Sequence, residues 1–128
     1  MIVVRNKTFW RNKMKTVEEI EIILAHQIGT EQYYKSQYFN FQYTDGVKAM
    51  WESCDSYWLL QLIGSYRRTE PFQVWELITF KDNTAVLTMK EDSNLPHKVS
   101  KKIRFTDFPL ESIKLYLIDG ILLLPSEY

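Results

Sequence analysis

The chain has few of the residues that build recognisable chemical sites. Its 128 residues include one cysteine, Cys54, four glycines and two histidines, His26 and His97. A single cysteine excludes an intramolecular disulfide and a cysteine-based metal cage. Scattered glycines form no phosphate-binding loop, and two isolated histidines form no metal-binding pair. We therefore expect no metal site, no cofactor and no known catalytic signature.

The chain also lacks net charge and long apolar runs. Lysine plus arginine equals aspartate plus glutamate at 16 each, so no global field draws the molecule to nucleic acid or membrane. No apolar run approaches the ~20 residues that span a bilayer, and we expect a cytoplasmic protein without membrane contact. The charge is nevertheless uneven: residues 1–15 hold five basic residues and no acid, so residues 16–128 carry −5.

Length and composition predict a single domain. Met14 stands directly before the first convincing helix start, which indicates that residues 1–13 are a basic N-terminal extension. Residues 14–128 are then expected to form one α+β domain.

Helical spacing dominates the first half of the chain. Thr16 and Glu19 form a capping box, and apolar residues at helical intervals predict a helix over 17–28. Two further helices are expected over about 45–54 and 57–66, each preceded by capping residues.

The second half changes to the period of β-strands. Strands are expected in five segments, near 72–80, 84–90, 98–105, 113–118 and 121–125. Asp119-Gly120 joins the last two, and this dipeptide is a strong signal for a tight hairpin. Helices first and strands later predict an α+β fold, with three N-terminal helices packed on one face of an antiparallel meander sheet of about five strands.

Three acidic residues are candidates for acid–base chemistry or cation binding: Asp45, Asp107 and Glu127. Such chemistry would require their oxygens to converge on one cleft. The two aspartates also lie at expected element boundaries, where aspartate caps helices and closes turns. A small carboxylate-dependent hydrolase and a purely structural role are therefore both open.

Aromatic residues make up 15% of the chain. Periodicity places Trp75 and Phe80 in the core, whereas the segment 30–43 matches neither period. The candidate binding residues of this segment are Tyr33, Tyr34, Tyr38, Phe39 and Tyr43. Because contiguous exposed aromatics mark contact sites, we expect a recognition surface here.

Basic residues near aromatics suggest nucleic-acid binding through Arg67, Arg68, Lys102 and Arg104. On the expected strand, however, Lys102 and Arg104 alternate with apolar residues, so a solvated strand face explains them as well. The acidic balance of residues 16–128 also opposes tight phosphate binding. An RNA- or DNA-binding module stays an alternative.

Six motifs in order carry a resemblance to a known family. They are Gly29–Tyr34, Tyr43–Lys48, Ser56–Leu60, Phe72–Trp75, Thr106–Leu110 and Leu123–Tyr128. Across roughly Val17 to Tyr128 the chain resembles a family of small bacterial and phage proteins classified as a domain of unknown function. The resemblance implies no catalytic residues and no cofactor.

The same resemblance implies an accessory role in a mobile element such as a phage or plasmid, including action against a host defence system such as CRISPR-Cas. Our first hypothesis is a non-catalytic binding or inhibitor protein that acts by contact with a larger protein or ribonucleoprotein. Inhibition of this kind needs a contact patch and no chemistry. A second copy of the chain also stays open as a partner, and catalysis is not decided by the sequence.

Overall fold

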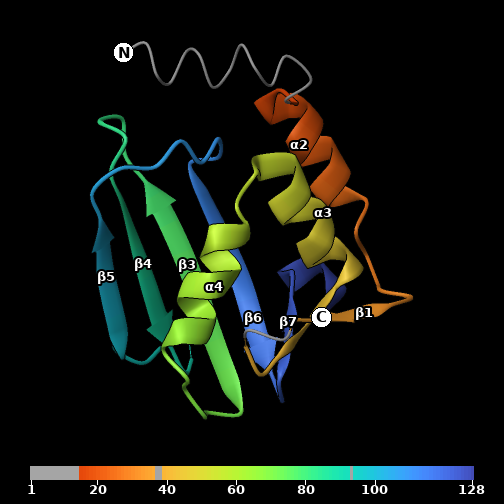
Figure 1. The fold of residues 1–128 in the computed structure, drawn as a ribbon, viewed down its shortest axis with the longest axis vertical. Helices are drawn as coiled ribbons and strands as arrows, with labels where there is room; N and C mark the ends of the chain where they lie inside the picture. The colour runs from red at the N-terminus through yellow and green to blue at the C-terminus, as the bar shows by residue number, and fades with distance from the viewer. Residues whose placement is uncertain (1–14, 37–38, 93) are drawn as a thin grey trace.

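The computed structural model describes residues 15–36, 39–92 and 94–128 (Figure 1). The helices are α2 (Val17–Ala25), α3 (Asp45–Cys54), α4 (Tyr57–Ser65) and the short 3-10 helix η1 (Pro125–Glu127). The strands are β1 (Tyr33–Lys35), β2 (Gln42–Thr44), β3 (Phe72–Thr79), β4 (Ala85–Lys90), β5 (Val99–Ile103), β6 (Ser112–Ile118) and β7 (Ile121–Leu123).

The described strands form a single seven-stranded sheet in the order β1-β2-β7-β6-β3-β4-β5. Every neighbouring pair is antiparallel except β2 and β7, which run parallel. Figure 1 shows α4 in front of the central strands and α3 in front of β7, with α2 packed beside α3. The opposite face of β3, β4, β5 and β6 carries no helix within the described residues.

The expected five-stranded antiparallel meander behind three N-terminal helices was wrong. The sheet is mixed, and the two extra strands lie between α2 and α3. The aromatic segment forms them because Phe41 and Tyr43 alternate inward and are 5% and 8% exposed, while Gln42 between them faces solvent. An alternation of three residues is too short to identify a strand from sequence alone.

The tight hairpin expected at Asp119-Gly120 is confirmed. Ile118 pairs with Ile121, and Asp119 and Gly120 between them have φ values of 50° and 82°. Positive φ at both central residues is the signature of a type I′ turn, whose twist matches that of the flanking strands. The hairpin places β7 between β6 and β2, where it joins the late strands to the early ones.

One face of the sheet forms the core with the helices. Side chains two residues apart point to the same face, and Trp75, Leu77, Leu115 and Leu122 are at most 1% exposed on the helix side. Phe80, expected in the core, is 51% exposed. It lies just past β3, and the alternation of that strand directs its side chain to the sheet face without helices. The hydrophobic core is therefore one layer between the helices and a single sheet face.

Local signals set the starts of the first two helices. The Thr16–Glu19 capping box is present at the start of α2, with hydrogen bonds in both directions. Helix α2 ends at Ala25, earlier than the expected residue 28, and the His26 ring contacts the Ile22 carbonyl at 2.7 Å from Nδ1. Thr44 caps α3 by accepting a hydrogen bond from the Val47 amide.

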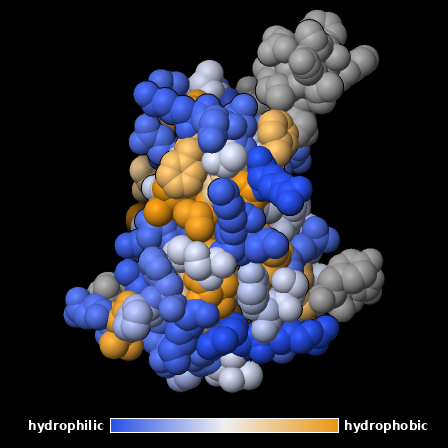
Figure 2. Space-filling view, turned by 90° about the vertical axis from the view of Figure 1, so that its left-hand side faces the viewer, coloured by the Kyte–Doolittle hydropathy of each residue, from blue (hydrophilic) through white to orange (hydrophobic). Residues whose placement is uncertain are grey.

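Strand β5 forms one edge of the sheet. Lys101 and Lys102 are exposed along it, and charged lysines on an edge strand disfavour pairing with another chain. Figure 2 looks at this side of the molecule, where hydrophilic residues surround smaller apolar areas. Among the helices of the described residues, none combines the length and apolarity needed to cross a bilayer.

The core layer predicts the effect of truncating a buried side chain. Leu122 of β7 is 0% exposed, so Leu122→Ala should lower the free energy of unfolding by about 2–5 kcal/mol, because it removes buried methyl groups and leaves a cavity. Leu95→Ala, at a position that is 47% exposed, is the matched control and should change it by less than about 1 kcal/mol. Urea unfolding measures both, and equal losses would contradict the placement of β7.

Candidate functional site

The carboxylate of Glu127 is engaged by backbone and side-chain donors. It accepts hydrogen bonds from the Thr44 hydroxyl at 2.6 Å, the Gly46 amide at 3.0 Å and the Leu124 amide at 2.9 Å. Gly46 lies in the first turn of α3, where unsatisfied amides and the helix dipole favour a negative charge. These bonds give Glu127 the structural role of fixing the C-terminal segment to the start of α3.

Asp45 has a similar structural environment. Its carboxylate accepts hydrogen bonds from the Glu31 amide at 2.9 Å, the Gln32 amide at 3.3 Å and the Tyr34 hydroxyl at 2.9 Å. The amide bond from Glu31 first, and the Tyr34 hydroxyl next, hold the pKa of Asp45 below its usual value. The same bond to Asp45 raises the pKa of Tyr34. Asp45 therefore fastens the loop before β1 to the start of α3.

The carboxylates do not assemble a recognisable reaction centre. Asp107 lies in the connection between β5 and β6, Asp45 is the first residue of α3, and Glu127 is the last residue of η1. Glu127 reaches the start of α3 through its carboxylate. Within the described ranges, no group of three or more histidine, cysteine, aspartate or glutamate side chains could hold a metal ion. Cys54 is 2% exposed, and burial raises the pKa of its thiol to about 12, which suppresses the reactive thiolate.

The aromatic segment is divided between core and surface. Phe39 and Tyr43 are 9% and 8% exposed and belong to the core, so they present little area to a partner. Tyr34 is half-buried and stacks on Tyr43 at 5.5 Å between ring centroids. Tyr33 is 54% exposed, and Tyr38 lies outside the described residues.

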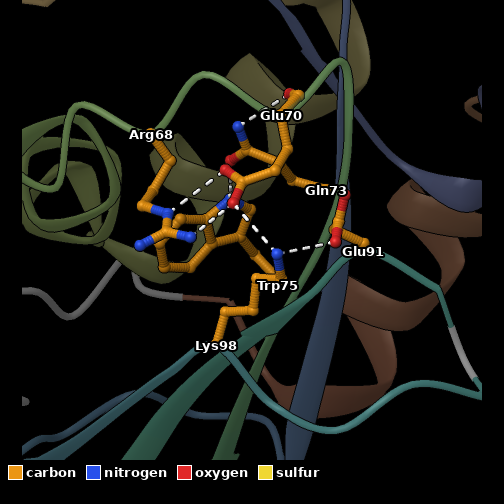
Figure 3. A network of polar contacts seen from close by, with 6 residues as sticks. All are labelled: Arg68, Glu70, Gln73, Trp75, Glu91 and Lys98. Carbon is orange, nitrogen blue, oxygen red and sulfur yellow. Dashed lines mark hydrogen bonds and ion pairs between the residues drawn. The ribbon is translucent and has the colours of Figure 1, made fainter.

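Arg68 belongs to a charged network between two loops (Figure 3). Its guanidinium pairs with both carboxylate oxygens of Glu70, and Lys98 lies 3.7 Å from Glu70 and 2.7 Å from Glu91. The hydrogen bond from Arg68 lowers the pKa of Glu70 to about 2. The four charged groups follow one another with alternating sign, in the order Arg68, Glu70, Lys98 and Glu91. The network therefore connects the α4–β3 loop to both ends of the β4–β5 loop.

Beneath the network lies a buried amide. Gln73 is 1% exposed; its Nε2 donates to the Glu70 carbonyl at 3.0 Å, and its Oε1 accepts from the Trp75 indole at 2.8 Å (Figure 3). Both ends of the amide are thus hydrogen-bonded, as burial requires. A pocket of about 350 Å³ lies beside these groups, and Arg67 and Arg68 contribute to its lining.

The four basic candidates lie in two different places. Arg67 and Arg68 follow α4 and line the pocket beside the network. Lys102 pairs with Val86 in the β4–β5 register, which places it on the sheet face without helices, and Arg104 follows with the same alternation. The structure therefore does not unite these residues into one nucleic-acid site.

A second concavity lies between α2 and the start of β6. It has a volume of about 960 Å³ and is lined on the helix by Val17, Glu21 and Leu24. Its other wall includes Leu110 and Ile113, and the end of the chain closes it where the Ser126 hydroxyl donates to the Gln27 carbonyl at 2.6 Å. One sequence feature indicates this groove: α2 contains several apolar residues, but only Ile20 is buried.

The backbone of β6 is open along this groove. Strand β7 covers β6 only over residues 116–118. Thr79 donates to the Glu111 carbonyl at 2.9 Å, so odd-numbered residues of β6 bond to β3 and even-numbered ones face away, by the alternation of antiparallel ladders. The amide and carbonyl groups of Ser112 and Lys114 therefore point toward the groove, where no described strand pairs with them.

The contacts of Glu127 predict a stability effect. Glu127→Gln should lower the free energy of unfolding by about 1–3 kcal/mol, because charge-assisted hydrogen bonds to the start of α3 are lost. Glu52→Gln, on the exposed side of the same helix, is the control and should cost less than about 1 kcal/mol. Chemical denaturation measures both. Unchanged stability of Glu127→Gln would show that the carboxylate is free for another role.

The network predicts a pH dependence. Because the pKa of Glu70 falls from 4.5 to about 2 on folding, its contribution to stability is fully present above about pH 4.5 and is lost as the pH falls toward 2. The difference in unfolding free energy between the wild type and Glu70→Gln should therefore shrink over this range. In an Arg68→Gln background the same substitution should show a weaker pH dependence. A difference that is constant from pH 6 to pH 2 would contradict the pairing.

Comparison with known proteins gives one assignment. Neither the curated proteins nor the solved structures include a match to this chain. A family model described as a family of unknown function (DUF6876) matches residues 18–128. This confirms the expected relationship to a domain of unknown function, and the chain belongs to the DUF6876 family.

Proposed function

We propose that the protein acts by contact rather than by catalysis, and that it holds an extended segment of a partner protein between α2 and the open edge of β6. The observation that carries this proposal is the groove of about 960 Å³ beside backbone groups of β6 with which no strand of the described residues pairs. An added strand obtains affinity from main-chain hydrogen bonds and specificity from pockets for alternate side chains. Neither requires a catalytic group.

The lining of the groove specifies the chemistry of this segment. Val17 and Leu24 offer an apolar wall, whereas Glu21 and Glu111 add negative charge. Lys114 also lines the groove, but the alternation of β6 directs its side chain to the opposite sheet face. The partner segment should therefore carry apolar side chains toward α2 and basic ones toward the two glutamates.

We also propose an accessory role in a mobile element and action against a host defence system. These proposals rest on the resemblance of the six sequence motifs to small bacterial and phage proteins. Contact inhibition is compatible with the groove, because a partner strand held on β6 is unavailable for its own assembly. The hydrolase alternative has less support, since Asp45 and Glu127 each hold donors of the fold.

The groove can be tested with two substitutions on one helix. Val17→Arg places a bulky charge at the groove, and Val17 is 39% exposed, so the fold should tolerate it. Ile22→Arg is the matched control, because Ile22 is 59% exposed and does not line the groove. With the full chain as bait in its native host, Val17→Arg should weaken capture of the partner by about tenfold or more, and Ile22→Arg should retain it.

Hydrogen exchange supplies an independent readout at the backbone. In the free protein the amides of Ser112 and Lys114 should exchange faster than those of Ile113 and Leu115, which bond to β3. Binding of the captured partner should protect Ser112 and Lys114. Protection elsewhere with none on these two amides would disprove strand addition, even if a partner binds.

A further inference from the structure

The face of the sheet opposite the helices has its own chemistry. Cross-strand register determines which side chains share this face: Val74 lies beside Tyr116 and Lys90, and Glu76 lies beside Lys114 and Thr88. These residues point away from the helices, because the residues of β3 that belong to the core cluster are Trp75 and Leu77, on the other alternation. Val74 and Thr88 are nevertheless 6% and 7% exposed, so the accessible part of this face is formed by the longer side chains around them. The face is continuous across four strands and has no helix over it among the described residues.

This face is basic within a chain of zero net charge. The charged residues that β3, β4, β5 and β6 place on it are Glu76, Lys90, Lys102 and Lys114, and Arg104 follows directly after β5. The bases thus outnumber the single acid, although residues 16–128 carry a net negative charge. Screening in physiological salt acts over about 8 Å, so a ligand on this face senses the local charge rather than the total.

Aromatic rings lie at both ends of the same face. At one end Phe72, Tyr116 and Tyr128 form a cluster with ring centroids 5.5, 5.6 and 6.3 Å apart, and Tyr128 is 79% exposed. At the other end Phe80 is 51% exposed; its amide pairs with the Thr84 carbonyl at 2.8 Å. Thr84 lies beside Arg104 by extension of the β4–β5 register, in which Ala85 pairs with Ile103.

We propose that this uncovered sheet face binds single-stranded nucleic acid. The exposed rings of Tyr128 and Phe80 stack bases at the two ends of the face. Lys114 lies between them, and Lys102 and Arg104 lie toward the Phe80 end on the β5 side, where they contact phosphates. Base stacking on aromatic side chains and charge complementarity to the backbone are the two terms that hold single strands on sheet surfaces. An open sheet face also suits the splayed bases of a single strand, whereas the bases of a duplex are read within its grooves.

The surface is distinct from the groove beside α2. Lys114 contributes to both, since it lines the groove while its side chain points to the uncovered sheet face. It is also distinct from Arg67 and Arg68, which lie by the charged network. The two proposals therefore fail independently, since Val17→Arg should leave binding on the sheet face unchanged.

Neighbouring residues on one strand provide the charge test. Lys102 points to the uncovered face, whereas Lys101 pairs with Leu87 on the helix side. Binding of fluorescently labelled single-stranded oligouridylate and oligothymidylate, each of about 15 nucleotides, is measured by anisotropy with the full chain. Lys102→Glu should weaken binding about tenfold and flatten the salt dependence by about one unit of slope. Lys101→Glu should have a much smaller effect.

Exposed tyrosines provide the matching ring test. Tyr128→Ser should weaken oligonucleotide binding about tenfold through loss of stacking, and Tyr33→Ser, at an exposed ring on the far edge strand, should not. The proposal is overturned if neither oligonucleotide binds at low salt, or if Lys101→Glu and Tyr33→Ser are as damaging as their counterparts. It is equally overturned if Lys102→Glu and Tyr128→Ser abolish capture of a protein but leave oligonucleotide binding intact.

Discussion

The hydrogen bonds of the Glu127 carboxylate are the constraint on which the arrangement of this protein depends. They join Leu124, after the last strand, to Thr44 and Gly46 at the junction of β2 and α3. The same junction carries the parallel pairing of β2 with β7, so one side chain fixes both the strand register and the position of the helix. Gly46 permits this approach, because a Cβ there would lie 2.5 Å from a Glu127 oxygen.

The helices and the C-terminal segment leave two surfaces of the sheet accessible among the described residues. Helices cover one face of the sheet, so the other face keeps its rings and basic residues accessible. Strand β7 is shorter than β6, so part of the β6 edge stays open beside α2. The charged network around Glu70 differs from these surfaces, since its opposite charges are paired with one another and contribute mainly to the positions of two loops.

The candidate site was predictable only in part. Asp45 and Glu127 stood out in the sequence, and the structural alternative for Asp45 at an element boundary agrees with its hydrogen bonds. Two of the three partners of Glu127 lie 81 and 83 residues away, a separation at which no local pattern identifies a contact. Arg67 and Lys102 looked alike in the sequence because both are basic residues near aromatics, but only cross-strand register shows that they belong to different surfaces.

The sequence by itself determined the features that depend on neighbours two to four residues apart. These are the capping box of α2, a capped helix start near Thr44 and Asp45, the Asp119-Gly120 turn and the alternation along β3 to β6. Only the tertiary structure decided that the aromatic segment forms strands, that β2 lies parallel to β7 and which sheet face stays uncovered. The physical reason is that short strands gain their hydrogen bonds and burial from distant segments, so their stability is a property of the assembled sheet.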